Sequence, residues 1–328
     1  MLYDFTNIEE VEKENHSSGN NKLLIPFVVR GGVKNWKAIA SWSADYLIKI
    51  AGNLPVKIKP KADHVNGKST RETEEQKVIL LKDAIELIFN ENSPALSYVR
   101  ESDLLSRCRQ LAADITAPVY LANSRPHAVP RTGSPDPKIW IGPSGTVAQL
   151  HWDPEHNFYA QVKGRKRVIL AAPNEYLRTY PNSFSIGELS HRTFFHRNED
   201  LLHKLQKCST SFLATTHKEP SSEFKAYLKQ ELSGPEVSLL CDFLAEVNNC
   251  NVNAETPDLI SHPAFSEAKR YEVILEPGDL LFIPYFWFHY LRSLEPSISV
   301  NWFFLPENLA PTIAEDQPLD ILLSHLTL

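Results

Sequence analysis

The sequence predicts a mainly β fold with additional helices, in which short antiparallel strands form a sandwich or barrel. From Trp140 onward, β-rich runs alternate with turns that contain Gly, Pro and Asp. Between about residues 182 and 256 this pattern changes to helical periodicity. The β-rich runs read IWIGPSGTVAQLHWD, FYAQVKGRKRVILAAP, RYEVILEPGDLLFIP and SISVNWFF. We therefore expect an N-terminal α/β flanking region over residues 1–137, a β core with a mostly helical insertion over 138–306, and a C-terminal tail over 307–328.

The composition is that of an ordinary globular protein. Of the 328 residues, 42% are hydrophobic and 23% charged, which excludes wholesale disorder, and the length suits one large domain or two small ones. A net charge of −6 argues against a broad nucleic-acid-binding surface. The four cysteines lack zinc-finger spacing, the N-terminus lacks an apolar signal segment, and no apolar run approaches the ~20 residues that span a bilayer. We expect a soluble intracellular protein, in the nucleus, the cytoplasm or both.

The N-terminal third contains one strand-like run and two helical ones. KLLIPFVVRGGV, residues 22–33, is rich in β-branched residues and ends in a Gly-Gly turn. In SADYLIKIAG, Ser43 suits a helix N-cap and Gly52 the position just past the helix end. Residues 81–90 also have helical spacing, whereas five prolines between Pro118 and Pro137 predict a long irregular connection.

The insertion and the tail carry the remaining helical signals. SSEFKAYLKQEL and PEVSLLCDFLAEVNN have helical periodicity, and we expect either packing segments or a lid or partner surface there. The tail contains one short amphipathic piece, LDILLSHL, which suits a dimer contact or packing on the chain's own core. The sequence leaves monomer and homodimer as alternatives.

One short stretch, QLHWDPEHNF, is unusual for a core strand. Alternation in a strand places His151 and Asp153 on one face and Trp152 on the other. One imidazole and one carboxylate are two of the three ligands in a 2-His-1-carboxylate Fe(II) site, which leaves positions open for O2 and a co-substrate. His289, in EPGDLLFIPYFWFHYL, follows a turn and an apolar strand and is a candidate second histidine. The alternatives are a polar turn at the first site and a core histidine at the second.

Four more residues suit the same pocket. Alternation in GRKRVILAAP places Lys166, Val168 and Leu170 on one face, and an inward lysine would bind a carboxylate, although an ordinary surface lysine is the alternative. The other three are Asn157, Asn301 and Tyr120, which offer amides and a hydroxyl. Together these residues describe a site for iron and an anionic, dicarboxylate-like co-substrate.

The ordered combination of these motifs resembles the JmjC-domain Fe(II)/2-oxoglutarate-dependent oxygenases, particularly the small single-domain hydroxylase-type subgroup. The likeness rests on HxD, an Asn six residues and a Lys fifteen residues after the first His, then PGDLLFIP before the second His, and VNWF. It covers most of the chain, from PFVVRGGVKNW to SISVNWFF. The resemblance implies a double-stranded β-helix, a squashed antiparallel barrel of the cupin or jelly-roll type.

The resemblance also implies residue roles. By position, the catalytic metal ligands are His151, Asp153 and His289, the co-substrate carboxylate partners are Lys166 and Tyr120, and the amides lining the site are Asn157 and Asn301. One position departs from the pattern. Relatives in this subgroup usually have Thr or Ser three residues before the first iron-binding histidine, and this chain has Ala148. Losing one such hydrogen bond typically costs ~0.5–1.5 kcal/mol, so we expect weaker co-substrate binding without its loss.

The implied activity is hydroxylation of an unactivated C–H bond with Fe(II), 2-oxoglutarate and O2, giving succinate and CO2. A protein side chain is the favoured substrate. The alternatives are a modified tRNA base, as in wybutosine hydroxylation, histone lysine demethylation, and a catalytically silent cupin that only binds partners. A second metal site at His191, His196 and His203 is not expected, because the first spacing, five residues, does not align on one helix face and no Cys or regular acidic partner completes a shell.

Overall fold

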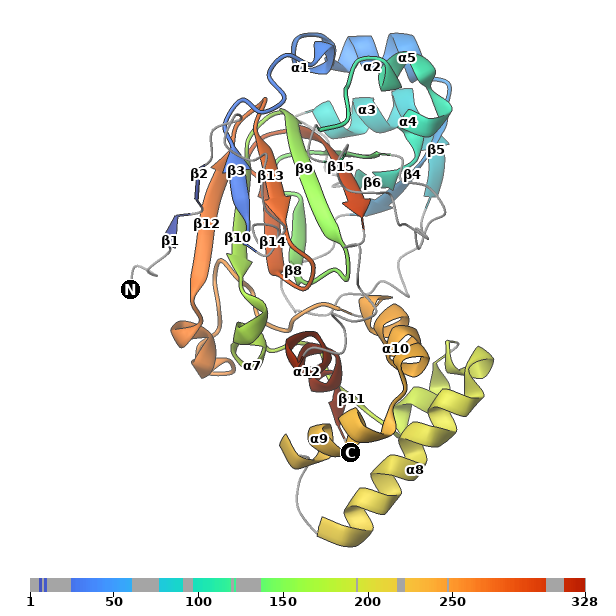
Figure 1. The fold of residues 1–328 in the computed structure, drawn as a ribbon. Coiled ribbons are helices and arrows are strands. Elements are labelled where there is room, and N and C mark those ends of the chain that lie inside the picture. The colour runs from blue at the N-terminus through green and yellow to red at the C-terminus, as the bar shows by residue number, and fades with distance from the viewer. Residues whose placement is uncertain are drawn as a thin grey trace.

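The computed structural model describes residues 6–7, 9–10, 25–60, 77–90, 97–118, 121, 137–192, 194–216, 222–246, 248–304 and 316–327. Two β-sheets face each other at the centre of the molecule, with one group of helices above them and another below (Figure 1). This arrangement confirms the predicted mainly β fold with N-terminal α/β elements and a helical insertion.

The first sheet has the strand order β1-β12-β10-β14-β8. Its pairs are antiparallel except for β1 with β12. Its strands are β1 (Thr6–Asn7), β8 (Val147–His151), β10 (Lys166–Ala171), β12 (Arg270–Leu275) and β14 (Phe288–Ser293).

The second sheet has the order β2-β3-β13-β9-β15-β7-β6-β4-β5, and only β2 and β3 pair in parallel. Its central strands are β3 (Phe27–Val29), β7 (Lys138–Gly142), β9 (His156–Lys163), β13 (Leu280–Ile283) and β15 (Ser297–Phe304). Its other strands are β2 (Glu9–Glu10), β4 (Pro55–Pro60), β5 (Lys77–Leu80) and β6 (Ser97–Ser102).

Alternation along each strand separates the barrel interior from the outer faces. Val168 and Leu170 of β10 lie in the interior cluster with Leu281 and Ile283 of β13, whereas Ile169 packs on the outer side with the helical insertion. Lys166 therefore starts an inward-facing row, as the sequence predicts. Apolar side chains line much of this interior, so its polar residues contact mainly one another.

The N-terminal helices cover the outer face of the second sheet (Figure 1). They are α1 (Lys37–Ser41), α2 (Ala44–Ala51), α3 (Leu81–Phe89), α4 (Leu104–Arg107) and α5 (Arg109–Ala112). The predicted cap is present, since the Ser43 hydroxyl accepts a hydrogen bond from the Tyr46 backbone N–H and α2 ends just before Gly52. The predicted irregular connection over 118–137 lies mostly outside the described residues.

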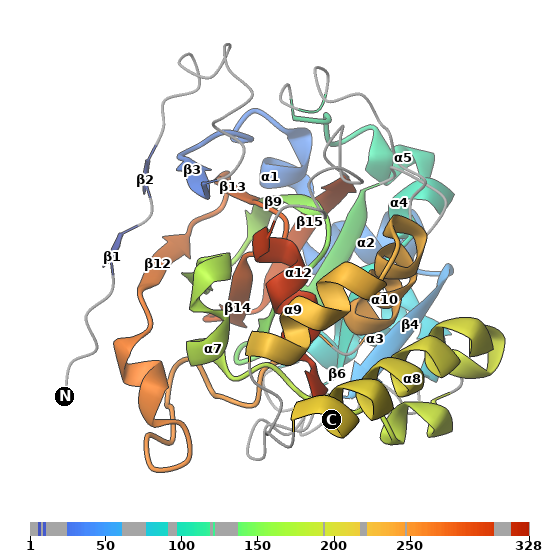
Figure 2. The ribbon, with the colours of Figure 1, turned by 60° about the horizontal axis from the view of Figure 1, so that its bottom comes forward.

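The insertion, the short helices that flank it and the tail form a helical layer at the opposite end (Figure 2). Its elements are η2 (Pro173–Glu175), α7 (Tyr176–Thr179), β11 (Phe184–Ser185), η3 (Glu188–His191), η4 (Phe195–Arg197), α8 (Glu199–Thr216), α9 (Ser222–Glu231), α10 (Gly234–Glu246), η5 (Pro263–Glu267), α12 (Asp316–Ser324) and β16 (Leu326–Thr327). Of the two alternatives for the tail, the structure shows packing on the chain's own core, because residues 321–323 of α12 are fully buried there. In the described part of the chain, we find no helix with the length and apolar character needed to cross a membrane.

Candidate metal centre

The two histidines of the predicted triad lie opposite each other on neighbouring strands. His151 ends β8, His289 lies near the start of β14, and the strand register pairs them directly. Their ring centroids are 4.1 Å apart, and both side chains are buried. The antiparallel pairing thus brings together two segments that lie far apart in the sequence.

Asp153 lies in the loop that follows β8 and completes the group. Its Oδ2 is 3.8 Å from His151 Nε2 and 3.3 Å from His289 Nε2. The three donor atoms all lie within 4.8 Å of one another. Trp152 points to the other side, into the outer cluster, as the sequence predicts, although the strand itself already ends at His151.

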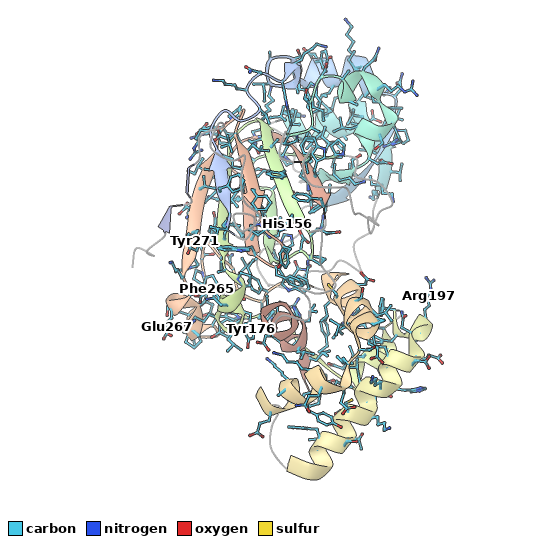
Figure 3. The ribbon with its side chains drawn as sticks, viewed as in Figure 1. His156, Tyr176, Arg197, Phe265, Glu267 and Tyr271 are labelled. Atoms are coloured by element: carbon cyan, nitrogen blue, oxygen red, sulfur yellow. The ribbon has the colours of Figure 1, made fainter. Side chains whose placement is uncertain are left out.

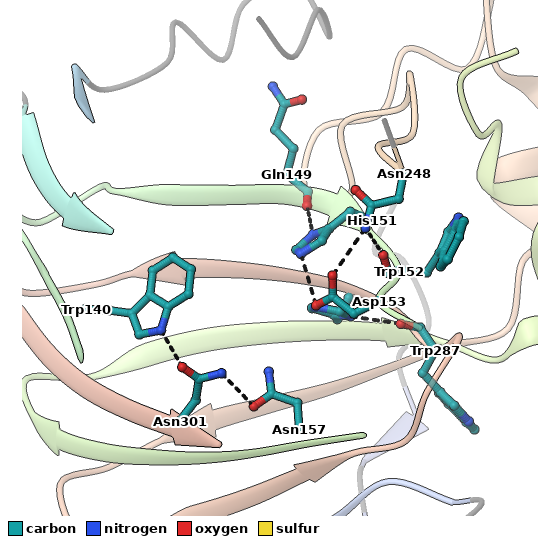
Figure 4. Close-up of polar contacts among 10 residues, drawn as sticks. Trp140, Gln149, His151, Trp152, Asp153, Asn157, Asn248, Trp287 and Asn301 are labelled. Atoms are coloured by element: carbon teal, nitrogen blue, oxygen red, sulfur yellow. Dashed lines mark hydrogen bonds and ion pairs between the residues drawn. The ribbon is translucent and has the colours of Figure 1, made fainter. Parts of the chain in front are cut away.

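Hydrogen bonds fix the orientation of both imidazoles. His151 Nδ1 donates to the Gln149 carbonyl at 2.6 Å, and His289 Nδ1 donates to the Trp287 carbonyl at 2.8 Å (Figure 4). Because a carbonyl oxygen only accepts, the proton is on Nδ1 and each Nε2 presents a lone pair toward Asp153. Two neutral imidazole nitrogens and one carboxylate oxygen that face one another are the donor set of 2-His-1-carboxylate Fe(II) sites. The residues present therefore fit Fe(II).

Asn248, from the end of the helical insertion, holds the Asp153 loop. Its side chain is fully buried, and Nδ2 donates to the Trp152 carbonyl and to Asp153 Oδ1, the latter at 3.2 Å. This contact leaves Oδ2 as the oxygen that faces the histidines (Figure 4). The sequence analysis missed Asn248, because no motif or spacing connects it with the HxD stretch.

Trp152, between His151 and Asp153, is anchored from outside the barrel. Its Nε1 donates to His325 Nε2 at 2.9 Å, and His325 Nδ1 donates to the Asn182 carbonyl at 2.5 Å. Burial lowers the pKa of His325 to about 4, so the imidazole is neutral and able to accept. Phe286 stacks on the Trp152 ring, with centroids 4.9 Å apart, and its backbone N–H donates to the Asp153 carbonyl.

The second histidine of the same stretch, His156, has a structural role. It lies among the barrel strands (Figure 3), and its Nδ1 accepts a hydrogen bond from the Tyr285 backbone N–H at 3.1 Å. Its ring packs against Phe282 and Phe304. Burial lowers the pKa of His156 to about 3, which keeps the imidazole neutral in the core.

A β-bulge places Ala148 on the same side of β8 as His151. His151 pairs with His289, but Leu291 pairs with Ala148, so β8 carries one extra residue between the two pairs. Ala148 accordingly packs against the interior cluster that contains Leu291. A hydroxyl at this position would point into the barrel, whereas the alanine side chain offers no hydrogen bond there.

Lys166 lies deeper in the same interior. Its side chain is 7% exposed, and Nζ donates to the Tyr159 hydroxyl at 2.6 Å and to Ser299 Oγ at 3.1 Å. Ser299 Oγ in turn donates to Gln161 Oε1 at 2.8 Å. The ammonium and the Tyr159 O–H each keep one donor for a further group, and no described carboxylate pairs with Lys166. Strand alternation would have identified Tyr159, Gln161 and Ser299, since they share inward rows with Asn157 and Asn301.

The two predicted asparagines bond to each other. Asn301 Nδ2 donates to Asn157 Oδ1 at 3.0 Å, and Trp140 Nε1 donates to Asn301 Oδ1 at 2.7 Å (Figure 4). Both amides are buried, so the apolar surroundings of Asn301 are compensated by hydrogen bonds. Tyr120, the remaining predicted residue, lies outside the described residues.

The structure brings six predicted residues together in one interior: His151, Asp153, Asn157, Lys166, His289 and Asn301. Among all residues that the structure describes, His151, Asp153 and His289 form the one cluster suited to a metal.

Comparisons with known proteins identify the family. A model of the cupin-like domain matches residues 16–309. The chain belongs to the cupin-like family of JmjC oxygenases. The predicted family and the predicted cupin-type barrel are therefore confirmed.

The names of individual relatives state different activities. The chain is 30% identical to lysine-specific demethylase 8 of Danio rerio over 85% of this chain and 53% of the relative. It is 23% identical to the human bifunctional peptidase and (3S)-lysyl hydroxylase JMJD7, over 85% and 77%. It is 27% identical to tRNA wybutosine-synthesizing protein 5 of Danio rerio, over 62% and 42%. The chain spans about half the length of several of the curated relatives that it matches.

Proposed function

We propose that this chain is an Fe(II)- and 2-oxoglutarate-dependent dioxygenase that hydroxylates an unactivated C–H bond on a protein side chain. When bound, iron, 2-oxoglutarate and O2 supply the oxidation: one oxygen atom enters the substrate as a hydroxyl, and the other enters succinate as CO2 is released. His151, Asp153 and His289 are the ligands that would hold the iron. These ligands would leave positions on the iron for the co-substrate and O2.

The observation that carries the proposal is the buried ammonium of Lys166. Burying a charge without a counter-charge is costly, yet Lys166 has two hydroxyl partners and no described acidic one. A carboxylate that enters the barrel would receive the third N–H of Lys166 and the O–H of Tyr159. Leu170 pairs with His289, and Lys166 lies four residues earlier on β10, about 13 Å along the strand at the Cα level. A linear dicarboxylate suits a pocket with a metal at one end and an ammonium at the other.

Two further features support an active centre over a silent scaffold. The Nδ1 hydrogen bonds orient both histidine Nε2 atoms toward one point, and Asn248 selects the facing oxygen of Asp153. A module that only binds partners through its surface has no use for either arrangement. The apolar walls around the centre, including Leu170 and Leu291, exclude bulk water from the reacting groups.

A protein substrate is favoured over tRNA. Two of the relatives carry protein-directed activities in their names, and the net charge of −6 disfavours a broad RNA surface. Hydroxylation and lysine demethylation begin with the same kind of step, hydroxylation of a C–H bond. In demethylation that bond belongs to an N-methyl group, so the choice between the two reactions depends on the substrate. The wybutosine relative keeps tRNA as the alternative, which strongly salt-dependent RNA binding would support. The intracellular location, the choice between monomer and homodimer, and the division into three regions stay predictions.

An anaerobic titration with Fe(II) and 2-oxoglutarate tests the proposal. A chelate of Fe(II) with the 2-oxo acid absorbs in the visible range, so we expect a saturable band in the wild type. Asp153→Ala removes the carboxylate ligand and should abolish the band. Asp45→Ala, at an exposed position in the first turn of α2, is the matched control and should leave it unchanged. Folded wild-type protein without a band would contradict the proposal and favour the silent binding module.

A further inference from the structure

A second lysine faces the barrel interior without an ionic partner. Lys138 starts β7, and its side chain is only 9% exposed. Alternation places it on the same face as Trp140, which packs on the interior cluster, whereas Ile139 and Ile141 belong to the outer cluster. Lys138 thus projects inward together with the Trp140 indole.

Strand topology places Lys138 at the metal-bearing end of the barrel. A tight turn joins β7 to β8, so the residues farthest from that turn, Lys138 and His151, lie at the same end. Lys138 pairs with Asn301, whereas Ser299, a partner of Lys166, pairs with Trp140. Lys138 therefore lies two residues nearer to the metal-bearing end than Ser299 and level with Tyr159, the other partner of Lys166.

No described carboxylate pairs with Lys138. In strands β7–β10 and β12–β15 the single acidic residue is Glu272, which lies on the outer face and pairs with Arg167 at 2.5 Å. The neighbouring strand β6 contains Glu101, whose side chain lies outside the described part of the structure. Asp153 is assigned to the metal. Among the described residues, the Lys138 ammonium has no hydrogen bond or ion pair, and its Nζ is not one of the fully buried unpartnered atoms, so it stays accessible to an incoming group. A second cation adds to the charge, because the Arg100 guanidinium lies 5.8 Å from the Trp140 ring centroid.

We propose that Lys138 binds a carboxylate of the primary substrate, so that the substrate carries an Asp or Glu at or directly beside the hydroxylated residue. This inference rests on the proposed function for its position next to the reacting centre. A buried ammonium is stabilised by an anionic group that replaces its lost hydration. The same charge repels a lysine or arginine side chain, and a repulsive element of this kind excludes basic substrates.

The co-substrate does not take this role. Lys166 and Tyr159 already provide a carboxylate site, in a network that Ser299 and Gln161 close. Lys138 is therefore available to the primary substrate. RNA phosphate has related chemistry, but the net charge of −6 favours an acidic peptide.

The test measures binding of short fluorescent peptide pools with a fixed central Asp, Asn or Lys, by fluorescence anisotropy. It uses the full chain, both alone and loaded with Mn(II) and 2-oxoglutarate without oxygen. The Asp pool should bind roughly tenfold or more tighter than the isosteric Asn pool, since a hydrogen bond to a charged group has that effect. Lys138→Met should bring the two pools within about twofold, and Lys138→Glu should reverse the preference toward the Lys pool. Lys57→Met, at an exposed position of β4, is the matched control and should change nothing.

A crossed comparison separates this site from the co-substrate site. Lys138→Met should lose the preference for the Asp pool and keep its affinity for 2-oxoglutarate. Lys166→Met should lose affinity for 2-oxoglutarate and keep the preference for the Asp pool. Equal binding of the Asp and Asn pools by wild type that forms the Fe(II) chelate would overturn the Lys138 site alone. An acidic preference that depends on Lys138 in protein that forms no chelate would support the site and contradict the oxygenase. Lys138-dependent binding of an oligoribonucleotide that displaces the Asp pool would overturn the peptide assignment in favour of RNA.

Discussion

Replacing Lys166 by Met should have opposite effects on stability and on co-substrate binding. In the protein alone, the variant removes a buried ammonium whose partners are two hydroxyls, and Met fills a similar volume. Ser299 keeps its bond to Gln161, so few polar groups lose their partners. We expect the free energy of unfolding of the variant without ligand to equal or exceed that of the wild type.

With 2-oxoglutarate present, the wild type should become more stable than the Lys166→Met variant. A hydrogen bond to a charged group contributes ~1.5–3 kcal/mol, so the Kd for 2-oxoglutarate should rise roughly 10- to 150-fold. At a concentration of about 100 times the wild-type Kd, the ligand stabilises the wild type by ~2.7 kcal/mol. The same concentration should stabilise the variant by only ~0.3–1.4 kcal/mol.

Thermal unfolding with Mn(II), with and without 2-oxoglutarate, measures both effects in one experiment. Lys57→Met on β4 is the exposed-lysine control and should follow the wild type in both conditions. A destabilised Lys166→Met variant that keeps the full shift with 2-oxoglutarate would show that the ammonium is structural. That result would refute the assignment of Lys166 to the co-substrate.

The remaining predictions concern the groups around the metal. Ala148→Ser adds a hydroxyl on the inward side of the bulge and should tighten 2-oxoglutarate binding ~2- to 12-fold in the chelate titration, while an unchanged Kd would place this position outside the pocket. Asn248→Ala frees Asp153 Oδ1 and should weaken metal affinity ~10- to 100-fold in a competition titration with a chelator, without abolishing folding. Burial lowers the pKa of His325 to about 4 from an unfolded value of ~6.5, so stability should fall by up to ~1.4 kcal/mol per pH unit as pH decreases from 6.5 toward 4. His325→Gln should flatten this part of the curve of melting temperature against pH, and an equal slope in both proteins would contradict the assignment.

The sequence alone predicted the donor set of the centre and determined the class of the fold. The short strands and turn residues predicted a sandwich or barrel of antiparallel strands, and the family resemblance implied the barrel. The two-residue period of a strand predicted the inward row that begins at Lys166. The HxD stretch and His289 could be recognised because each places a metal-binding group in an otherwise apolar run. These properties are local, and the sequence contains them directly.

Tertiary structure decided which distant residues complete the centre. The resemblance already implied that position 148 faces the pocket, and strand register supplied the reason, a bulge that turns Ala148 inward where simple alternation would place it opposite His151. Asn248 and His325 reach the HxD loop from the insertion and the tail, and no spacing rule connects them to it. The role proposed for Lys138 depends on its burial on an inward row and on the lack of a described acidic partner. Partners brought together by chain folding depend on the path of the whole backbone, which a local pattern does not encode.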